Sequence, residues 1–258
     1  MSVTTISQDG ATGVHTTRGR VRAVAVAAAI TVVALVVGIV ASIPVLVGFA
    51  LAGYDITAVE TLARPEVLVL SAFATQGSML LVGYGYVRRY GLAVPVRLPT
   101  RADALVAGVG VVAAIVLAIL GSLVISLVVP VDQGATSVLG DIGAVDPVAL
   151  LVFAALSVVW IAPAEEYLFR GVVQGRVRQA FGIGATLAVA GALFASIHVF
   201  NYAGTAAVIA AYLGLLVLVS VVFGYAYERT GNLTVPIAIH ALYNAVLLGG
   251  SYLALVWG

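Results

Sequence analysis

The sequence predicts an all-α, polytopic membrane protein, a helical bundle of about seven transmembrane helices. Apolar residues make up 62% of the 258 residues, charged residues only 9%, and the mean hydropathy is +1.17. A soluble domain carries roughly 25% charged residues, so this chain has too few charges to cover a water-facing surface. The apolar residues are also gathered into long runs. We therefore expect the lipid bilayer to surround most of the chain.

Each transmembrane helix needs roughly 20 apolar residues to cross the hydrocarbon core of a bilayer. Seven stretches meet this length or come near it. We expect spans at about 24–52, 67–87, 104–129, 148–174, 184–199, 205–227 and 233–257. The fifth stretch is short. The first contains Pro44, which can kink or break a helix, so an eighth, broken span is left open.

The first stretch follows Arg18, Arg20 and Arg22, as the apolar part of a signal peptide follows its charged region. That apolar part is only about 7–15 residues long in a signal peptide, and this stretch is about twice as long. We therefore expect an uncleaved first span. Residues 1–22, rich in Thr, Ser and Gly before these arginines, are expected to form a disordered cytoplasmic tail.

Arginine is unevenly distributed between the connections. On one side of a seven-span chain lie Arg18, Arg20, Arg22, Arg88, Arg89, Arg97, Arg101, Arg176, Arg178 and Arg229. The other side carries Arg64 alone, and its loop around 130–147 has only acidic charges. Short cytoplasmic loops are enriched in basic residues, so we expect a multi-pass plasma-membrane protein with a cytoplasmic N-terminus. Residues 88–103 would lie along the cytoplasmic interface.

Charge and cysteine content exclude several classes of function. The formal net charge is +1, which gives no basic face for nucleic acid. The chain has no cysteine, so it has no disulfide framework, no thiolate metal site and no cysteine nucleophile.

Charged side chains inside a membrane helix cost roughly 2.5–3.5 kcal/mol or more, and they are usually functional. The fourth stretch contains Glu165, Glu166 and Arg170. Glu166 and Arg170 are one turn apart and can pair, whereas Glu165 points about 100° away from Glu166. The unpaired Glu165 is therefore a candidate proton acceptor or donor. The alternative is a helix end that emerges into water with both glutamates solvated.

Two further clusters interrupt the apolar pattern. Phe194 and His198 share one face of the fifth stretch, and His240 and Asn244 share one face of the seventh. A lone histidine in a helix is more often a packing residue, and an asparagine can serve as an interhelical hydrogen-bond group.

The turn around Gly182 relates the first two clusters. Glu165 lies 17 residues before it and His198 lies 16 after it, so in an antiparallel hairpin both sit on the order of 25 Å from the turn. They are then level with each other, and a Glu165–His198 pair is physically easy. We expect Glu165, His198, His240 and Asn244 to line one cavity.

The three clusters, taken in order, resemble the CPBP family of intramembrane proteases, which includes CAAX prenyl endopeptidases and abortive-infection and bacteriocin-processing proteins. Its pattern is Glu-Glu-x-x-x-Arg, Phe-x-x-x-His and His-x-x-x-Asn. The matching residues are Glu165, Glu166, Arg170, Phe194, His198, His240 and Asn244. The resemblance covers about residues 145–250. It implies a catalytic transmembrane core at 145–258, whereas the N-terminal transmembrane helices at 23–144 are expected from hydropathy alone.

The resemblance also implies roles in a glutamate-dependent endopeptidase. Glu165 would activate water, with His198 helping to hold or activate it. His240 and Asn244 would stabilise the oxyanion, and the supporting residues would be Glu166, Arg170 and Phe194. The substrate would be a membrane-associated protein or peptide, and whether it is lipidated is left open.

A metal is left open as well. Glutamate and histidine can bind zinc, and Glu165, His198 and His240 would be its ligands, but a site without a cofactor is favoured because no His-Glu-x-x-His motif is present. The alternative function is a non-catalytic membrane immunity or scaffold protein of the same fold. A proton-coupled carrier is a third reading, although the chain lacks the paired interrupted spans of inverted-repeat carriers.

Overall fold

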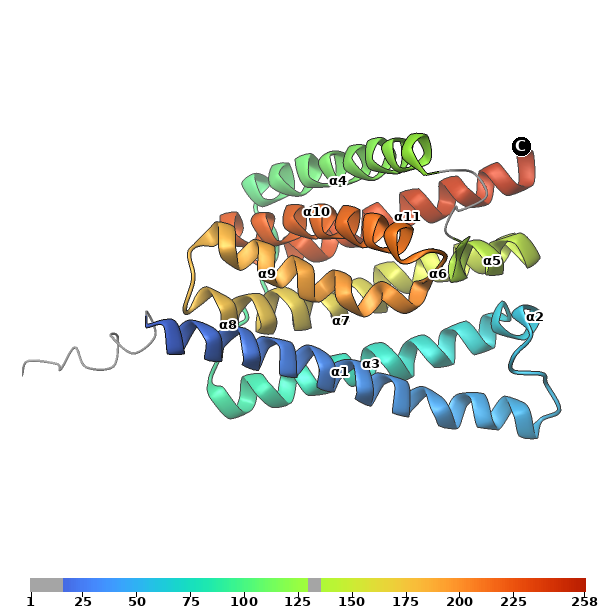
Figure 1. Cartoon of the computed structure of the whole chain (residues 1–258), viewed down its shortest axis with the longest axis horizontal. Coiled ribbons are helices and arrows are strands. Elements are labelled where there is room, and N and C mark those ends of the chain that lie inside the picture. Colours follow the sequence, from blue (N-terminus) through green and yellow to red (C-terminus); the bar gives the residue numbers. More distant parts are fainter. Residues whose placement is uncertain (1–15, 130–135) are drawn as a thin grey trace, which may run out of the picture.

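The computed structural model describes residues 16–129 and 136–258, which form a bundle of helices (Figure 1). Within them, seven helical spans are long and apolar enough to cross a membrane. They are α1 (Thr17–Leu51), α3 (Pro65–Tyr90), α4 (Arg101–Val128), a fourth span over Pro147–Arg178, a fifth over Ile183–Asn201, α10 (Ala206–Thr230) and α11 (Thr234–Trp257). The protein is therefore a multi-pass integral membrane protein, and the expected fold class is confirmed.

Helix α1 begins earlier than the sequence indicated. Its N-cap is Thr16, whose side-chain oxygen accepts a hydrogen bond from the Gly19 N–H at 3.1 Å. Residues 17–22, expected to be disordered, are therefore helical, and the remainder of the expected tail, residues 1–15, lies outside the described residues. The helix also continues through Pro44 without a break, so the eighth span left open there does not arise.

The connection between α3 and α4 is held against the turn between α10 and α11. Gly91, with a φ of +66°, ends α3, and a capping box formed by Thr100 and Asp103 begins α4. Between these helix ends the chain is extended, and the carbonyl of Pro95 accepts a hydrogen bond from the Leu233 N–H at 2.9 Å. Only the middle of the stretch 88–103 is thus non-helical.

The fourth span is not a uniform α-helix. It runs through α6 (Pro147–Leu156), a π-helical segment η3 (Ser157–Ile161), α7 (Ala162–Glu166), a second π-helical segment η4 (Tyr167–Gln174) and α8 (Gly175–Arg178). The fifth span is α9 (Ile183–Ser196) followed by a 3₁₀ turn, η5 (Ile197–Asn201).

Short elements cover one end of the bundle. They are α2 (Val59–Leu62), β1 (Thr136–Ser137), α5 (Val138–Val145) and β2 (Tyr202–Ala203). The two strands pair antiparallel, with Ser137 opposite Tyr202. The expected domain boundary at 144/145 falls at the end of α5.

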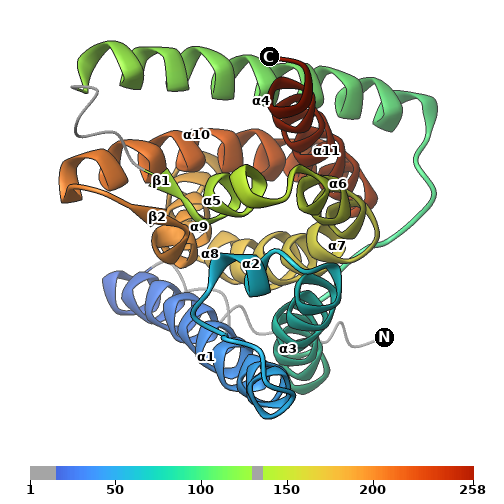
Figure 2. The same ribbon diagram turned by 90° about the vertical axis from the view of Figure 1, so that its right-hand side faces the viewer.

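The helices pack as two groups on either side of the fourth span (Figure 2). On one side α1 packs on α3, and on the other α10 and α11 pack on α4. A buried core around Leu168, Phe169 and Phe194 joins the fourth and fifth spans to α1 and α3. A second core around Phe223 and Ile239 joins α4, α10 and α11. The fourth span is thus in contact with both groups.

Candidate active site

The two adjacent glutamates lie in α7, the short α-helical segment between the two π-helical ones. Pro163 lies two residues before Glu165 and has no N–H to donate to the preceding turn. A helix widened to π geometry accommodates such a loss, and π segments are frequent at functional sites. The sequence therefore places a local change of helical register at the position of the carboxylates.

Glu166 is the centre of a buried charge cluster. Its Oε1 lies 2.9 Å from His240 Nδ1, and its Oε2 lies 2.9 Å from Arg170 Nε. Glu166 and Arg170 are fully buried, and His240 is 4% exposed. The carboxylate accepts a hydrogen bond from the Nδ1–H of His240, while the Arg170 contact is close but not aligned for a hydrogen bond. Glu166 therefore holds the His240 ring with Nδ1 toward itself and Nε2 toward Glu165.

Arg170 is held by aromatic rings as well as by its carboxylate. Its guanidinium carbon lies 4.9 Å from the ring centroid of Phe194 and 5.6 Å from that of Phe223. These distances are within the range of cation–π attraction. Among the described residues its Nη2 has no hydrogen-bond partner. The rings therefore contribute attraction that hydrogen bonds do not supply.

Glu165 has different surroundings, although it is also buried (5% exposed). Its Oε1 accepts a hydrogen bond from Gln76 Nε2 of α3 at 3.5 Å. Its Oε2 lies 3.9 Å from His240 Nε2. Glu165 therefore faces His240, and the pair expected from the helical hairpin, Glu165–His198, is not among the contacts recorded for the described residues.

His198 lies at the end of the fifth span, in η5. Its Nδ1 is 2.9 Å from the carbonyl oxygen of Phe194, one turn earlier. A carbonyl oxygen only accepts hydrogen bonds, so Nδ1 carries the hydrogen and the neutral ring has a free lone pair on Nε2. The His198 ring also contacts that of Phe194, with centroids 4.7 Å apart.

Asn244 lies one turn after His240 on α11. Its Nδ2 donates a hydrogen bond to the hydroxyl oxygen of Ser157, a fully buried residue of η3, at 2.8 Å. An amide nitrogen carries two hydrogens, so one remains free to bind another acceptor.

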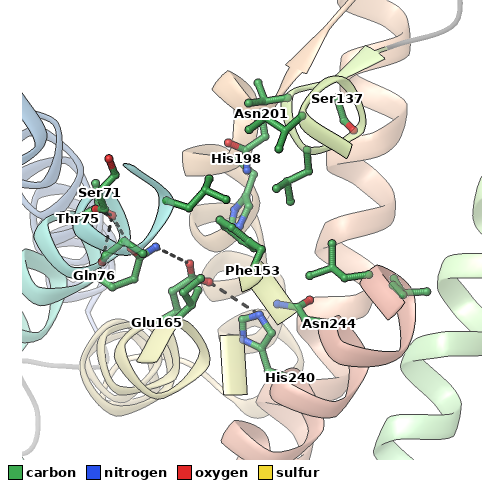
Figure 3. A pocket seen from close by; sticks show the side chains of 18 of the residues that line it. Ser71, Thr75, Gln76, Ser137, Phe153, Glu165, His198, Asn201, His240 and Asn244 are labelled. Carbon is green, nitrogen blue, oxygen red and sulfur yellow. Dashed lines mark hydrogen bonds and ion pairs between the residues drawn. The ribbon is translucent and has the colours of Figure 1, made fainter. Parts of the chain in front are cut away.

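A cavity of about 540 Å³ brings the four expected catalytic residues together. Glu165, His198, His240 and Asn244 all line it, and Figure 3 shows their side chains directed toward this shared space. Phe194 lines the cavity too. Glu166 and Arg170 are not in its wall but lie behind it, buried in contact with His240 and Phe194 respectively.

Residues 147–246 match a family model described as type II CAAX prenyl endopeptidase Rce1-like. The match covers 100 of the 258 residues and supports membership of the CPBP family. Comparisons with curated proteins and with solved structures found no match.

The CPBP family is generally one of proteases, and its matched segment in this chain contains all seven residues identified from the sequence. Three further residues around the site were missed: Gln76, Ser157 and Phe223. Gln76 had a signal, because an amide within an apolar span is unusual. Ser157 and Phe223 had none, because serine and phenylalanine are ordinary residues of membrane helices.

The CPBP segment does not gather a ligand set for zinc. Among the described residues, no three His, Cys, Asp or Glu side chains are grouped so that they could hold a metal ion. Zinc would need its ligands at about 2.0–2.2 Å from one point. His240 Nδ1 is engaged by Glu166, and the Nδ1 of His198 by a backbone carbonyl.

Proposed function

We propose that the protein is an intramembrane endopeptidase of glutamic type that hydrolyses peptide bonds of membrane-associated substrates. One observation carries the proposal: among the described residues Glu165 is a buried carboxylate that forms no direct ion pair with an arginine, and it lines a cavity together with two imidazoles and a free amide hydrogen. Proton acceptors and hydrogen-bond donors around one small space are what hydrolysis of an amide needs.

The first step is addition of water to the substrate carbonyl. Glu165 accepts a proton from water as the water oxygen bonds to the carbonyl carbon. His198 holds the same water through the lone pair of Nε2. The carbonyl oxygen becomes an oxyanion, which receives hydrogen bonds from the free Nδ2 hydrogen of Asn244 and from His240 Nε2. Because Nδ1 of His240 already donates to Glu166, donation from Nε2 requires a doubly protonated ring.

The second step is collapse of the tetrahedral intermediate. The carbon–nitrogen bond breaks, and protonated Glu165 returns its proton to the leaving amine. The apolar surroundings exclude bulk water and strengthen the hydrogen bonds to the oxyanion. Glu166 and Arg170 take no part in proton transfer and hold His240 in orientation.

N-terminal proteomics of membranes from producing cells tests the proposal. New protein N-termini should appear with the wild-type protein and be absent with Glu165→Gln and Asn244→Ala. Glu60→Gln is the matched control, because it makes the same chemical change at an exposed glutamate of α2. The same termini in the Glu165→Gln sample, or none in the wild-type sample, would contradict the proposal.

We further propose that the site works without a bound metal. Metal analysis of purified active protein should then give well below one zinc per chain, and activity should survive a strong chelator. One zinc per chain that is lost in His198→Ala would contradict this.

A further inference from the structure

We propose that the cavity opens at the end of the bundle opposite the arginine-rich one, and that its substrate is an apolar peptide segment presented from the extracytoplasmic side of the membrane. The cleavage of that segment rests on the proposed function. The direction of access does not rest on the proposed function, because it follows from the shape of the cavity and the positions of the charges.

The floor of the cavity is in the middle of the bundle. Its most deeply buried lining residues include Phe194 and Phe223, each 1% exposed, together with Glu165 and His240. Arg170 and the core around Phe169 lie behind them. The cavity therefore ends at the charge cluster.

The walls lead from this floor in one direction. On α3 they extend from Gln76 back to Val67, near the start of the helix. On α11 they extend from His240 forward to Leu248, toward its end. Because α3 begins where α11 ends, both walls lead to the same end of the bundle (Figure 1).

The rim of the cavity is made by the short elements at that end. Ser137, Val138, Leu139 and Ile142 of β1 and α5 line it, as do Asn201 and Tyr202. Val138 is 45% exposed and Asn201 is also exposed, in contrast to the buried floor. The gradient of exposure, from floor to rim, marks this end as the mouth.

The opposite end is closed by contacts between spans. Gln174 of η4 donates hydrogen bonds to the Gly224 carbonyl at 3.1 Å and to the Glu228 carboxylate at 2.9 Å, and Glu228 pairs with Arg178 at 3.0 Å. Val94 packs so closely on Gly171 that a Cβ there would lie 2.7 Å from it. None of the described residues at this end lines the cavity.

The closed end is also the basic end. Ten of the twelve arginines belong to helix ends or connections there, Arg170 is buried, and Arg64 alone lies at the open end. The open end carries acidic residues instead, among them Asp55, Glu60 and Asp141. Cytoplasmic connections are enriched in basic residues, so the mouth faces the extracytoplasmic side.

The chemistry of the walls selects an apolar segment. Between the rim and the catalytic side chains the lining is largely aliphatic, with Leu68, Leu139, Ile142, Leu247 and Leu248. One turn of a helix with its side chains, about 10–12 Å wide and 5.4 Å long, already fills on the order of 500 Å³. The cavity of about 540 Å³ thus takes a short piece of chain. A lipidated cytoplasmic tail would have to pass through the closed end.

Cysteine accessibility tests the direction of access without any need for activity. The native chain has no cysteine, and Ser71→Cys introduces a near-isosteric thiol inside the cavity. A small, membrane-impermeant methanethiosulfonate reagent should modify it in spheroplasts and leave it unmodified in inside-out vesicles. Leu98→Cys, at a 90% exposed position of the closed end, is the reference and should show the opposite behaviour. Modification of Ser71→Cys from the cytoplasmic side only, or from neither side, overturns the proposal.

The location of cleavage tests the substrate class. New N-termini that depend on Glu165 should map to apolar segments at or beyond the extracytoplasmic ends of membrane spans or in exported peptides. Termini confined to cytoplasmic tails would overturn the inference. If Ser71→Cys is labelled from outside but no new N-terminus depends on Glu165, the proposed function is contradicted. The direction of access is then still supported.

Discussion

Glu165 and Glu166 are neighbours in the chain with different electrostatic partners. Glu166 contacts both Arg170 and the Nδ1 of His240, whereas Glu165 accepts from the neutral amide of Gln76 and lies farther, at 3.9 Å, from the Nε2 of His240. The sequence predicted the pairing of Glu166 with Arg170 because it is local, one helical turn apart. It did not predict the contact of Glu166 with His240, which joins spans 74 residues apart.

Substitution by glutamine should have a different effect at each of the two glutamates. Glu166→Gln leaves Arg170 as a buried, unpaired cation and should lower the free energy of unfolding by about 3–5 kcal/mol, as breaking a buried pair does. Glu165→Gln should be inactive and nearly as stable as the wild type. Thermal unfolding of the purified variants in detergent, with cleavage assays, measures both effects. Equal losses of stability in Glu165→Gln and Glu166→Gln would contradict the different roles of the two glutamates.

Ser157 should act on catalysis through Asn244. Ser157→Ala frees the amide to rotate, and loss of orientation should lower kcat by about ten- to a hundredfold. Ser126→Ala is the matched control, because this serine donates only to a backbone carbonyl on the exposed face of α4. In an Asn244→Ala background Ser157→Ala should cause no further loss. A full additional loss there would show that Ser157 acts independently.

At the scale of elements, the long helices could be predicted because each is a run of apolar residues. The π-helical segments could not, since their apolar content does not distinguish them from an α-helix. Helix α5 and the strands β1 and β2 are too short for a hydropathy signal, and the pairing of the strands joins residues 67 positions apart, Thr136 and Ala203. Thus the floor of the site followed from the sequence except for Phe223, and its rim did not.

The contact between α4 and α11 should be sensitive to a single methyl group. A Cβ at Gly110 would lie 2.4 Å from Cδ1 of Ile239, the fully buried neighbour of His240. Gly110→Ala should therefore lower stability by about 1–3 kcal/mol and reduce activity through displacement of α11.

Gly108→Ala in the same helix meets no atom within 4 Å and is the matched control. It should be neutral or stabilise the protein by up to about 1 kcal/mol, because alanine favours a helix more than glycine does. Thermal unfolding of both variants decides the matter, and equal melting temperatures would show that Ile239 moves aside without cost.

At the scale of the whole molecule, the orientation predicted from arginine can be measured by cysteine labelling. Asp141→Cys, exposed on α5, should react with an impermeant maleimide added to intact spheroplasts. Gln179→Cys, exposed next to α8, should react only after the membrane is opened. The reverse pattern would invert the topology.

The ion pair of Glu166 and Arg170 lies within one span, and this matters for how the chain is made. During synthesis the fourth span emerges long before α11, so Glu166 meets Arg170 while His240 does not yet exist. The two opposite charges enter the bilayer as a neutral unit, which lowers the cost of inserting either alone. Gln76, in an earlier span, is already in place for Glu165. Each buried carboxylate thus has a partner at the moment its own span is inserted.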